Sequence, residues 1–157
     1  MSVMTRVKKA PMPKLGYVGA VGKLCIEVKW KAGRRKGRTE IVDLAPMINA
    51  FKFYKPLRSD AAAFKALELV DGGEVLAWKN GEIDMAATSV ERLAEEAMTG
   101  SEFKAFLQRH KLTYDAAAAL LGRSRRQIGY YVAGSSKMIP RLVALACLGF
   151  SAREAAA

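Results

Sequence analysis

At 157 residues the chain is long enough for one ordinary domain or two small ones, and its 51% hydrophobic content argues against disorder over the whole length. The formal net charge of +11 is uneven, because residues 1–38 and 98–157 are basic whereas residues 39–97 are acidic. Basic ends favour a polyanionic partner, although a charge of this size would also serve solubility alone.

The cysteines and the apolar segments indicate a cytoplasmic protein. Cys25 and Cys147 are far apart in sequence, so we expect free thiols in a reducing compartment rather than a zinc site or a disulfide framework. No apolar core follows the basic N-terminus, as a secretory signal would require. The longest strongly apolar run, Leu142–Phe150, is far shorter than the roughly 20 residues of a bilayer span, so no membrane partner is expected.

The first part of the chain predicts a basic arm and a β-hairpin. Residues 1–14 place lysines among prolines and indicate a flexible basic arm, which is either a mobile tail or a segment that lies along phosphates. Apolar and polar residues alternate over Lys23–Lys31, which is typical of a half-buried strand, and Arg38–Leu44 is its expected partner. The turn at residues 32–37 has a basic tip that could touch phosphate, although such loops are common without a ligand.

Short elements are expected in the middle of the chain. Pro46 begins one short helix, and Asp60 caps another that ends near Phe64. Three short strands follow, separated by Gly-containing turns, over Ala66–Val70, Glu74–Trp78 and residues 83–85. The predicted fold class is therefore α+β, with a small α+β domain that has an antiparallel sheet at residues 15–97.

Two helix starts lie close together after this domain. Thr88 and Glu91 have the spacing of a capping box, and so do Thr99 and Glu102. Starts only eleven residues apart imply a break between the helices, which places the domain boundary near Met98. The remaining residues, 98–157, are expected to form an all-α domain that begins with a helix carrying Phe103, Phe106, Leu107 and His110 on one face.

The sequence from Leu112 to Gly134 predicts two short helices joined by a tight turn. Thr113 and Ser124 are good N-caps, and Gly122 supplies the positive φ that ends the first helix. This is the layout of a helix-turn-helix, whose second helix lies in the DNA major groove. We expect Ala117 and Ala118 at the crossing of the two helices. The residues expected to face the core are Leu120, Leu121, Ile128 and Tyr131, and those expected to face outward are Ser124, Arg125, Arg126, Gly129 and Tyr130.

A last helix is expected after Pro140, which suits a first turn. Its side chains expected to bury against the helix pair are Leu142, Val143, Leu145, Ala146 and Leu148.

Convergent groups of the kind an enzyme needs are not recognisable, so no enzymatic activity, cofactor or metal is expected. The single histidine, His110, lies on an apolar helix stripe, where packing is a more common role than catalysis. Asp43 and Asp84 could pair as carboxylates, but no third group accompanies them, and turn capping explains both equally well.

The C-terminal residues LTYDAAAALLGRSRRQIGYYVAG, followed by IPRLVALACLGF, resemble the Cro and phage-repressor-like helix-turn-helix family. The resemblance covers about 55 residues and implies that the start of the second helix contacts DNA. That family often has Gln where Tyr114 stands, Val at Arg123 and Glu at Val132.

The N-terminal part is similar to the bacterial domain-of-unknown-function family 2442. The matching residues are the strand before Trp30, then IVDLAPMI, the region of Phe64, and EVLAWKNGEIDM. The resemblance implies a small α+β domain that is sometimes fused to a helix-turn-helix and sometimes encoded beside toxin-like genes. Here the longer loop AGRRKG replaces the short Asp-Gly hairpin of that family.

Together these features predict a sequence-specific DNA-binding transcriptional regulator that binds double-stranded DNA as a homodimer. Arg125, Arg126 and Gln127 would meet bases or phosphates at the groove. Contacts to the DNA backbone are expected from Ser124, Tyr130, Arg123 and Lys137. The alternative is an antitoxin-like interaction protein, whose N-terminal domain binds a protein partner and whose helix-turn-helix serves autoregulation. RNA binding is less favoured, because the strands lack stacking aromatics.

Overall fold

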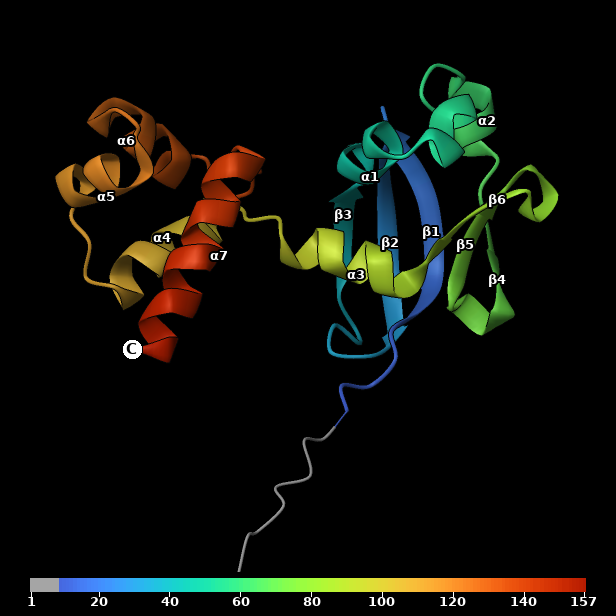
Figure 1. Ribbon diagram of the computed structural model, residues 1–157, viewed down its shortest axis with the longest axis horizontal. Helices are drawn as coiled ribbons and strands as arrows, with labels where there is room; N and C mark the ends of the chain where they lie inside the picture. The colour runs from blue at the N-terminus through green and yellow to red at the C-terminus, as the bar shows by residue number, and fades with distance from the viewer. Residues whose placement is uncertain (1–8) are drawn as a thin grey trace, which may run out of the picture. The chain divides into compact units, whose positions relative to one another are not determined.

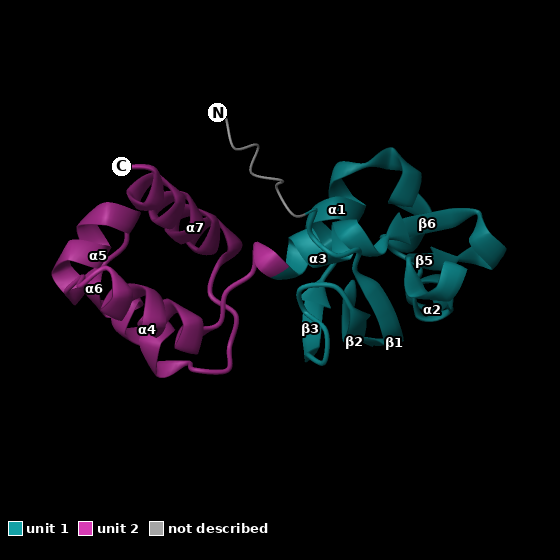
Figure 2. Cartoon of the chain, turned by 90° about the horizontal axis from the view of Figure 1, so that it is seen from below, with its two compact units in different colours: residues 1–94 teal, residues 95–157 magenta. Residues whose placement is uncertain are grey.

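The computed structural model describes residues 9–157 and has an α+β fold that divides between Ala94 and Glu95 (Figure 1, Figure 2). The sequence placed this division slightly later, between residues 97 and 98. Most of the predicted basic arm, residues 1–8, lies outside the described residues. The arm was predicted to end at residue 14, but Lys14 is already the first residue of a strand.

Over its described residues, unit 1 contains two antiparallel three-stranded sheets where the sequence predicted one. The first sheet consists of β1 (Lys14–Gly22), β2 (Cys25–Ala32) and β3 (Thr39–Asp43) in that order. The second consists of β4 (Glu68–Val70), β5 (Val75–Trp78) and β6 (Ile83–Ala86). The helices are α1 (Ala45–Ala50), α2 (Ala61–Lys65) and α3 (Ala87–Glu95), with 3₁₀ turns η1 (Lys52–Leu57), η2 (Asp71–Gly73) and η3 (Lys79–Gly81).

Strand β1 was not predicted from the sequence. It pairs with β2 along its whole length, from Lys14 opposite Ala32 to Gly22 opposite Cys25, and the register shifts at three places. Glycines within β1 offer no side chain to a periodic pattern, and they tolerate the bulges at which the register shifts. The strand is therefore defined by its pairing with β2 rather than by its own composition.

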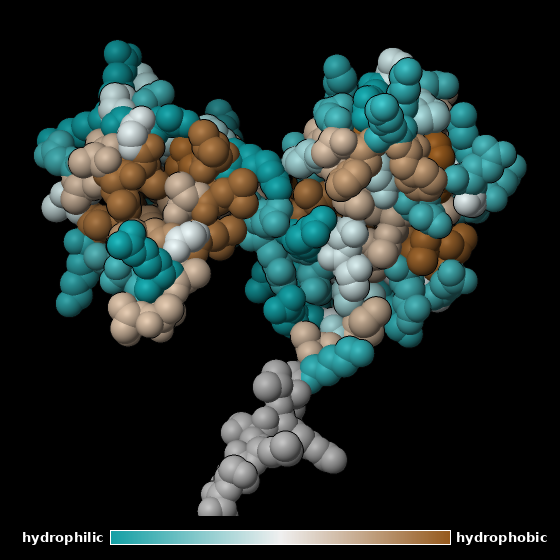
Figure 3. Space-filling model, viewed as in Figure 1, coloured by the Kyte–Doolittle hydropathy of each residue, from teal (hydrophilic) through white to brown (hydrophobic). Residues whose placement is uncertain are grey.

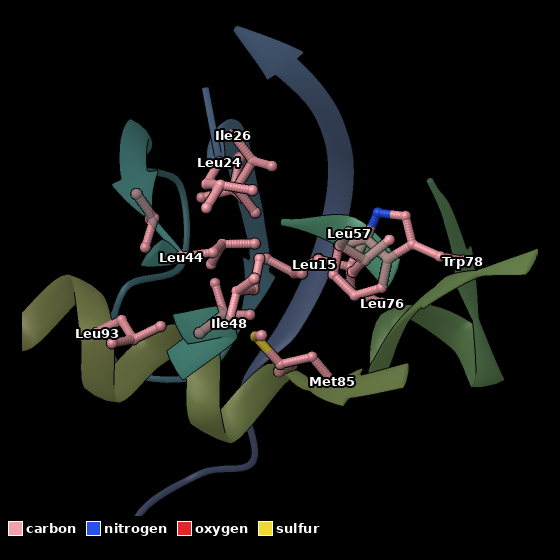
Figure 4. Close-up of a cluster of buried hydrophobic side chains, with 14 of the residues drawn as sticks. Leu15, Leu24, Ile26, Leu44, Ile48, Leu57, Leu76, Trp78, Met85 and Leu93 are labelled. Carbon is pink, nitrogen blue, oxygen red and sulfur yellow. The ribbon is translucent and has the colours of Figure 1, made fainter. Parts of the chain in front are cut away.

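The alternation predicted for β2 is confirmed. Ile26, Val28 and Trp30 are buried, whereas Lys29 points to the solvent-facing side of the sheet. The buried face packs against the helices and the second sheet to form the core of unit 1 (Figure 4). Its large contributors from those elements are Leu44, Ile48, Leu57, Phe64, Leu76, Trp78, Met85, Val90 and Leu93.

The basic tip of the β2–β3 hairpin binds carboxylates of its own unit. Arg35 donates two hydrogen bonds to Glu40, at 2.6 and 2.7 Å, and Arg34 pairs with Glu91 of α3 at 3.2 Å. The predicted capping box of Thr88 and Glu91 is wrong, because β6 runs directly into α3 and Glu91 turns to the hairpin instead. These contacts tie α3 to the first sheet.

Unit 2, Glu95–Ala157, is helical. Its helices are α4 (Gly100–Arg109), α5 (Tyr114–Leu121), α6 (Arg125–Ala133) and α7 (Arg141–Ala156). As predicted, Thr99 caps α4, since its hydroxyl oxygen accepts a hydrogen bond from the backbone N–H of Glu102 at 3.2 Å. Gly100 is required at this start, because a β-carbon there would collide with the carbonyl oxygens of Tyr131 and Gly134.

The face by which α7 packs differs from the prediction. Val143 is buried as expected, but Leu142, Leu145 and Leu148 are exposed, and so is Ala146. The helix is instead anchored by Val143, Ala144 and Cys147. Because α7 is apolar around most of its circumference, periodicity could not select the buried face.

Candidate nucleic-acid interface

Helices α5 and α6 are held by the caps that the sequence predicted. Thr113 Oγ1 accepts a hydrogen bond from the N–H of Ala116 at 3.1 Å, and Ser124 Oγ accepts one from the N–H of Gln127 at 3.1 Å. Between the helices, Gly122 has φ +62°, the left-handed conformation that ends α5. The three-residue connection, 122–124, matches the short turn of a helix-turn-helix.

The packing of the helix pair follows the prediction in part. Ala117 of α5 and Ile128 of α6 are fully buried, and Tyr131 stacks edge-on against Phe103 at 5.8 Å between ring centroids. Leu120 is exposed rather than buried, which corrects its predicted place in the core. Gly129 is half-buried and faces Tyr114 instead of pointing outward. The register of the pair is therefore set by Ala117 and Ile128.

Arg125 lies at the first position of α6 and is exposed. Its Nη1 is 3.3 Å from Asp115 Oδ2 on α5, and the two side chains are 69% and 74% exposed. An ion pair so open to solvent contributes little to stability, typically 0–1 kcal/mol. The guanidinium group can therefore exchange Asp115 for a phosphate or a base edge at little cost.

Arg126 and Tyr130 form one exposed pair a helical turn apart. Arg126 Nε donates a hydrogen bond to Tyr130 Oη at 2.9 Å, and its guanidinium carbon is 5.4 Å from the centre of the tyrosine ring. Tyr130 is 60% exposed. The ring restricts the arginine and leaves both groups on the outer face of α6, where the sequence predicted them.

Gln127 closes a capping box instead of extending from the helix. Its Oε1 accepts a hydrogen bond from the backbone N–H of Ser124 at 3.0 Å, while Ser124 Oγ caps the N–H of Gln127. Both side chains thus satisfy donors at the start of α6. The Gln127 oxygen therefore has a capping role, and the predicted contact of Gln127 with a base or phosphate stays a prediction.

Arg123 and Lys137 flank α6 at its two ends. Arg123 is half-buried, and its Nη1 donates to the carbonyl of Gly122 at 3.4 Å. Lys137 is exposed in the α6–α7 loop, where its carbonyl accepts a hydrogen bond from the N–H of Gly100 at 2.9 Å. A helix of nine residues spans about 13 Å. The structure therefore gathers Arg123, Arg125 and Arg126 at one end of α6 and places Lys137 beyond the other.

Two lysines that were not predicted as site residues lie beside the start of α5. Lys104 and Lys111 line a small hollow of about 250 Å³ together with Tyr114. Lys104 is on α4 and Lys111 follows it, so their position next to Tyr114 depends on how α4 packs against the helix pair. No spacing within the sequence could have shown this.

His110 and Cys147, the potentially reactive side chains of unit 2, pack among apolar residues. His110 packs between the rings of Phe106 and Phe150, with centroid distances of 4.8 and 4.9 Å, and its Nε2 lies 2.9 Å from Ser151 Oγ. Burial raises the pKa of the Cys147 thiol to about 11, which suppresses its thiolate form. Over residues 9–157, no group of three His, Cys, Asp or Glu side chains is placed to hold a metal ion. The same residues include no helix with the length and apolarity needed to cross a bilayer.

No model of a protein family matches the chain, and no curated protein matches it either. Among solved structures, the chain is similar to a protein of Nitrosomonas europaea described as a "Putative DNA Binding Protein". The two share 28% sequence identity over 90% of this chain and 88% of the other, with a TM-score of 0.45.

Proposed function

We propose that the protein is a sequence-specific regulator that binds double-stranded DNA through α5 and α6, with α6 in the major groove. The main support for this proposal is that α6 has one buried side and one exposed, basic side. Ile128 fixes one side of the helix in the core of unit 2, Arg126 and Tyr130 project from the other side, and Arg125 is exposed in the first turn. A capped, exposed helix with arginines in its first turn has the geometry of a major-groove reader.

Within this proposal the exposed residues have distinct roles. Arg125 and Arg126 suit the O6 and N7 acceptors of guanine, which a guanidinium group can contact with two hydrogen bonds. Arg123, Ser124, Tyr130 and Lys137 are assigned to the phosphate backbone. Lys104 and Lys111 extend that basic surface to the start of α5, where a first helix crosses the DNA backbone.

We further propose that two copies act together, because one short helix contacts too few base pairs for useful affinity. In paired sites the recognition helices lie about 34 Å apart, one turn of the duplex. An interaction of unit 1 with a separate protein, as in an antitoxin, is the competing function. A second protein that copurifies stoichiometrically and releases the DNA would favour it.

The double substitution Arg125→Ala and Arg126→Ala tests the proposed function. Binding to a duplex selected from a random library should weaken by at least tenfold, because each lost bidentate contact is worth about 1–3 kcal/mol. The free energy of unfolding should change by less than about 0.5 kcal/mol, as for other surface substitutions. Affinity is measured by fluorescence anisotropy at several salt concentrations, and stability by urea unfolding.

The matched control is Lys52→Ala with Lys55→Ala, which removes the same charge from exposed positions in unit 1. Affinity in the control should stay within about threefold of that of the unaltered chain. The salt dependence of the unaltered chain should be steep, with a log–log slope of about −0.9 for each phosphate neutralised. Equal losses of DNA affinity in the two variants, or an affinity that does not change with salt, would show that α6 is not part of the interface.

A further inference from the structure

Unit 1 contains a cavity that DNA binding does not use. Its volume is about 820 Å³, within the range typical of small-molecule sites. Its lining comes from the β1–β2 turn, the end of η1 and the start of α2. The lining residues that matter here are Lys23, Leu24, Leu57, Arg58, Phe64 and Lys65.

The floor of this cavity is apolar and well supported. Leu24, Leu57 and Phe64 are each at most 5% exposed and belong to the core of unit 1. Trp78 supports Phe64. Its indole N–H donates to the Phe64 carbonyl at 2.9 Å, and the two rings stack with their centroids 6.1 Å apart. The floor is therefore formed before any ligand arrives.

The turn that brings Leu24 into the floor is conformationally unusual. Leu24 has φ +58°, in the left-handed region that leucine rarely adopts. Its carbonyl accepts a hydrogen bond from the N–H of Leu44 at 2.8 Å, which holds the turn against the end of β3. Such strain persists only where the surroundings impose it, and it is concentrated at functional sites.

The rim of the cavity is positively charged. Lys23, Arg58 and Lys65 line it, and no acidic residue does. Arg58 is fixed, because its Nε and Nη2 donate to the carbonyls of Ile48 and Phe51 at 2.9 and 3.0 Å. Among the described residues, neither Lys23 nor Lys65 has a carboxylate within ion-pair distance.

We propose that this cavity binds a small organic anion with an apolar body, such as a carboxylate attached to a hydrocarbon or aromatic group. The apolar part would rest on Leu24, Leu57 and Phe64, and the anionic group would lie at the rim near Lys23 and Lys65. An inorganic anion would leave the apolar floor unused, and a neutral lipid would leave the cations unmatched. The inference concerns unit 1 alone and does not depend on DNA binding.

The direct test is calorimetric titration of the full chain with octanoate, 1-octanol and octylammonium, which share one tail and differ in charge. Octanoate should bind at least tenfold more tightly than 1-octanol, and octylammonium should show no binding. Replacing Lys23 and Lys65 by Gln should weaken octanoate binding at least tenfold and leave the weak binding of 1-octanol unchanged. Both lysines are exposed, so the double variant should fold.

A second pair of variants tests the location. Ala61→Trp places a large ring at the cavity wall and should abolish octanoate binding, whereas Ala62→Trp changes the neighbouring exposed residue outside the lining and should not. Thermal unfolding establishes that each variant is folded. The proposal is overturned if octanoate fails to bind, if octylammonium binds equally well, or if both tryptophan variants bind like the unaltered chain.

Discussion

The clearest electrostatic feature at the scale of single residues is the Glu40 carboxylate. It accepts hydrogen bonds from the buried indole N–H of Trp30 at 2.9 Å and from two nitrogens of Arg35. Burial by itself would raise the pKa of Glu40, but the hydrogen bonds from Arg35 and Trp30 outweigh it and lower the pKa below its usual value. Arg35 of the basic hairpin tip is thus part of the scaffold, in keeping with the interpretation that such a tip needs no ligand.

The pKa of Glu40 predicts how stability depends on pH. A carboxyl group whose pKa is lowered by folding stabilises the protein fully above its unfolded pKa of about 4.3, and this contribution is lost as the pH falls through the folded pKa. Glu40→Gln should therefore cost about 1–2 kcal/mol at pH 7, as for lost hydrogen bonds to a charged group. The cost should shrink as the pH is lowered from 5 to 3. Urea unfolding at each pH measures it.

The control for this prediction is Glu82→Gln, at an exposed carboxylate of the same unit. Its effect on the free energy of unfolding should stay below about 0.5 kcal/mol throughout the pH range. A penalty for Glu40→Gln that is the same at pH 3 and pH 7 would contradict the role assigned to the ionised carboxylate.

At the scale of elements, Gly129 and Gly100 of unit 2, both within helices, have opposite surroundings. A β-carbon on Gly129 of α6 would meet only the Tyr114 ring, at 3.9 Å, which is an ordinary contact. A β-carbon on Gly100 of α4 would collide with backbone carbonyls that cannot move aside. The first glycine weakens its helix without a packing reason, whereas the second is required by the fold.

Gly129→Ala should therefore stabilise the chain by about 0.5–1 kcal/mol, because alanine lowers the entropy of the unfolded chain and fits the helix. Gly100→Ala should destabilise it by more than that amount, since α4 must shift to relieve the collision. Urea unfolding of both variants measures the difference. If Gly129→Ala were destabilising, α6 would not have the helical conformation and packing described here.

The elements that could be predicted from sequence are those fixed by local chemistry. The caps at Thr113 and Ser124 and the positive φ at Gly122 depend on residues within one turn, so the helix pair was found with its ends close to their observed places. Strand β1 and the buried face of α7 depend on partners far along the chain. For the same reason the basic hollow of Lys104 and Lys111, and the cavity at Lys23 and Lys65, had no signature in the sequence.

At the scale of the whole molecule, net charge does not distinguish the unit proposed to bind DNA. Residues 1–94 contain 17 Lys or Arg and 10 Asp or Glu, and residues 95–157 contain 9 and 5, so both units are basic. What distinguishes unit 2 is the concentration of arginines at the capped end of one exposed helix. In unit 1, Arg34 and Arg35 form ion pairs with carboxylates of that unit, and Lys23, Arg58 and Lys65 line a cavity.

The proposed pairing of two copies can be tested at the exposed leucines of α7. Leu142, Leu145 and Leu148 are 70%, 39% and 38% exposed; Leu142 and Leu145 lie on the side of α7 opposite its buried residues, and Leu148 lies at the edge of the buried face. Figure 3 shows apolar residues gathered on the face of unit 2 that carries α7. Gly149 lies on the same side with open space above it, so a second helix can approach closely. An exposed apolar helix face is a candidate contact surface, and a second α7 would cover this one.

Replacing Leu142 and Leu145 by Glu should therefore keep the chain monomeric, because two charged side chains per copy would face each other across the apolar surface. Sedimentation velocity over a range of protein concentrations should show a concentration-dependent dimer for the unaltered chain and a monomer for the variant. Leu142→Met with Leu145→Met keeps the surface apolar and should retain the dimer. DNA affinity should fall in the glutamate variant alone, because its two half-sites would no longer be bound by a linked pair. A glutamate variant that dimerises as well as the unaltered chain would exclude α7 as the contact between copies, while leaving the proposed groove contact of α6 intact.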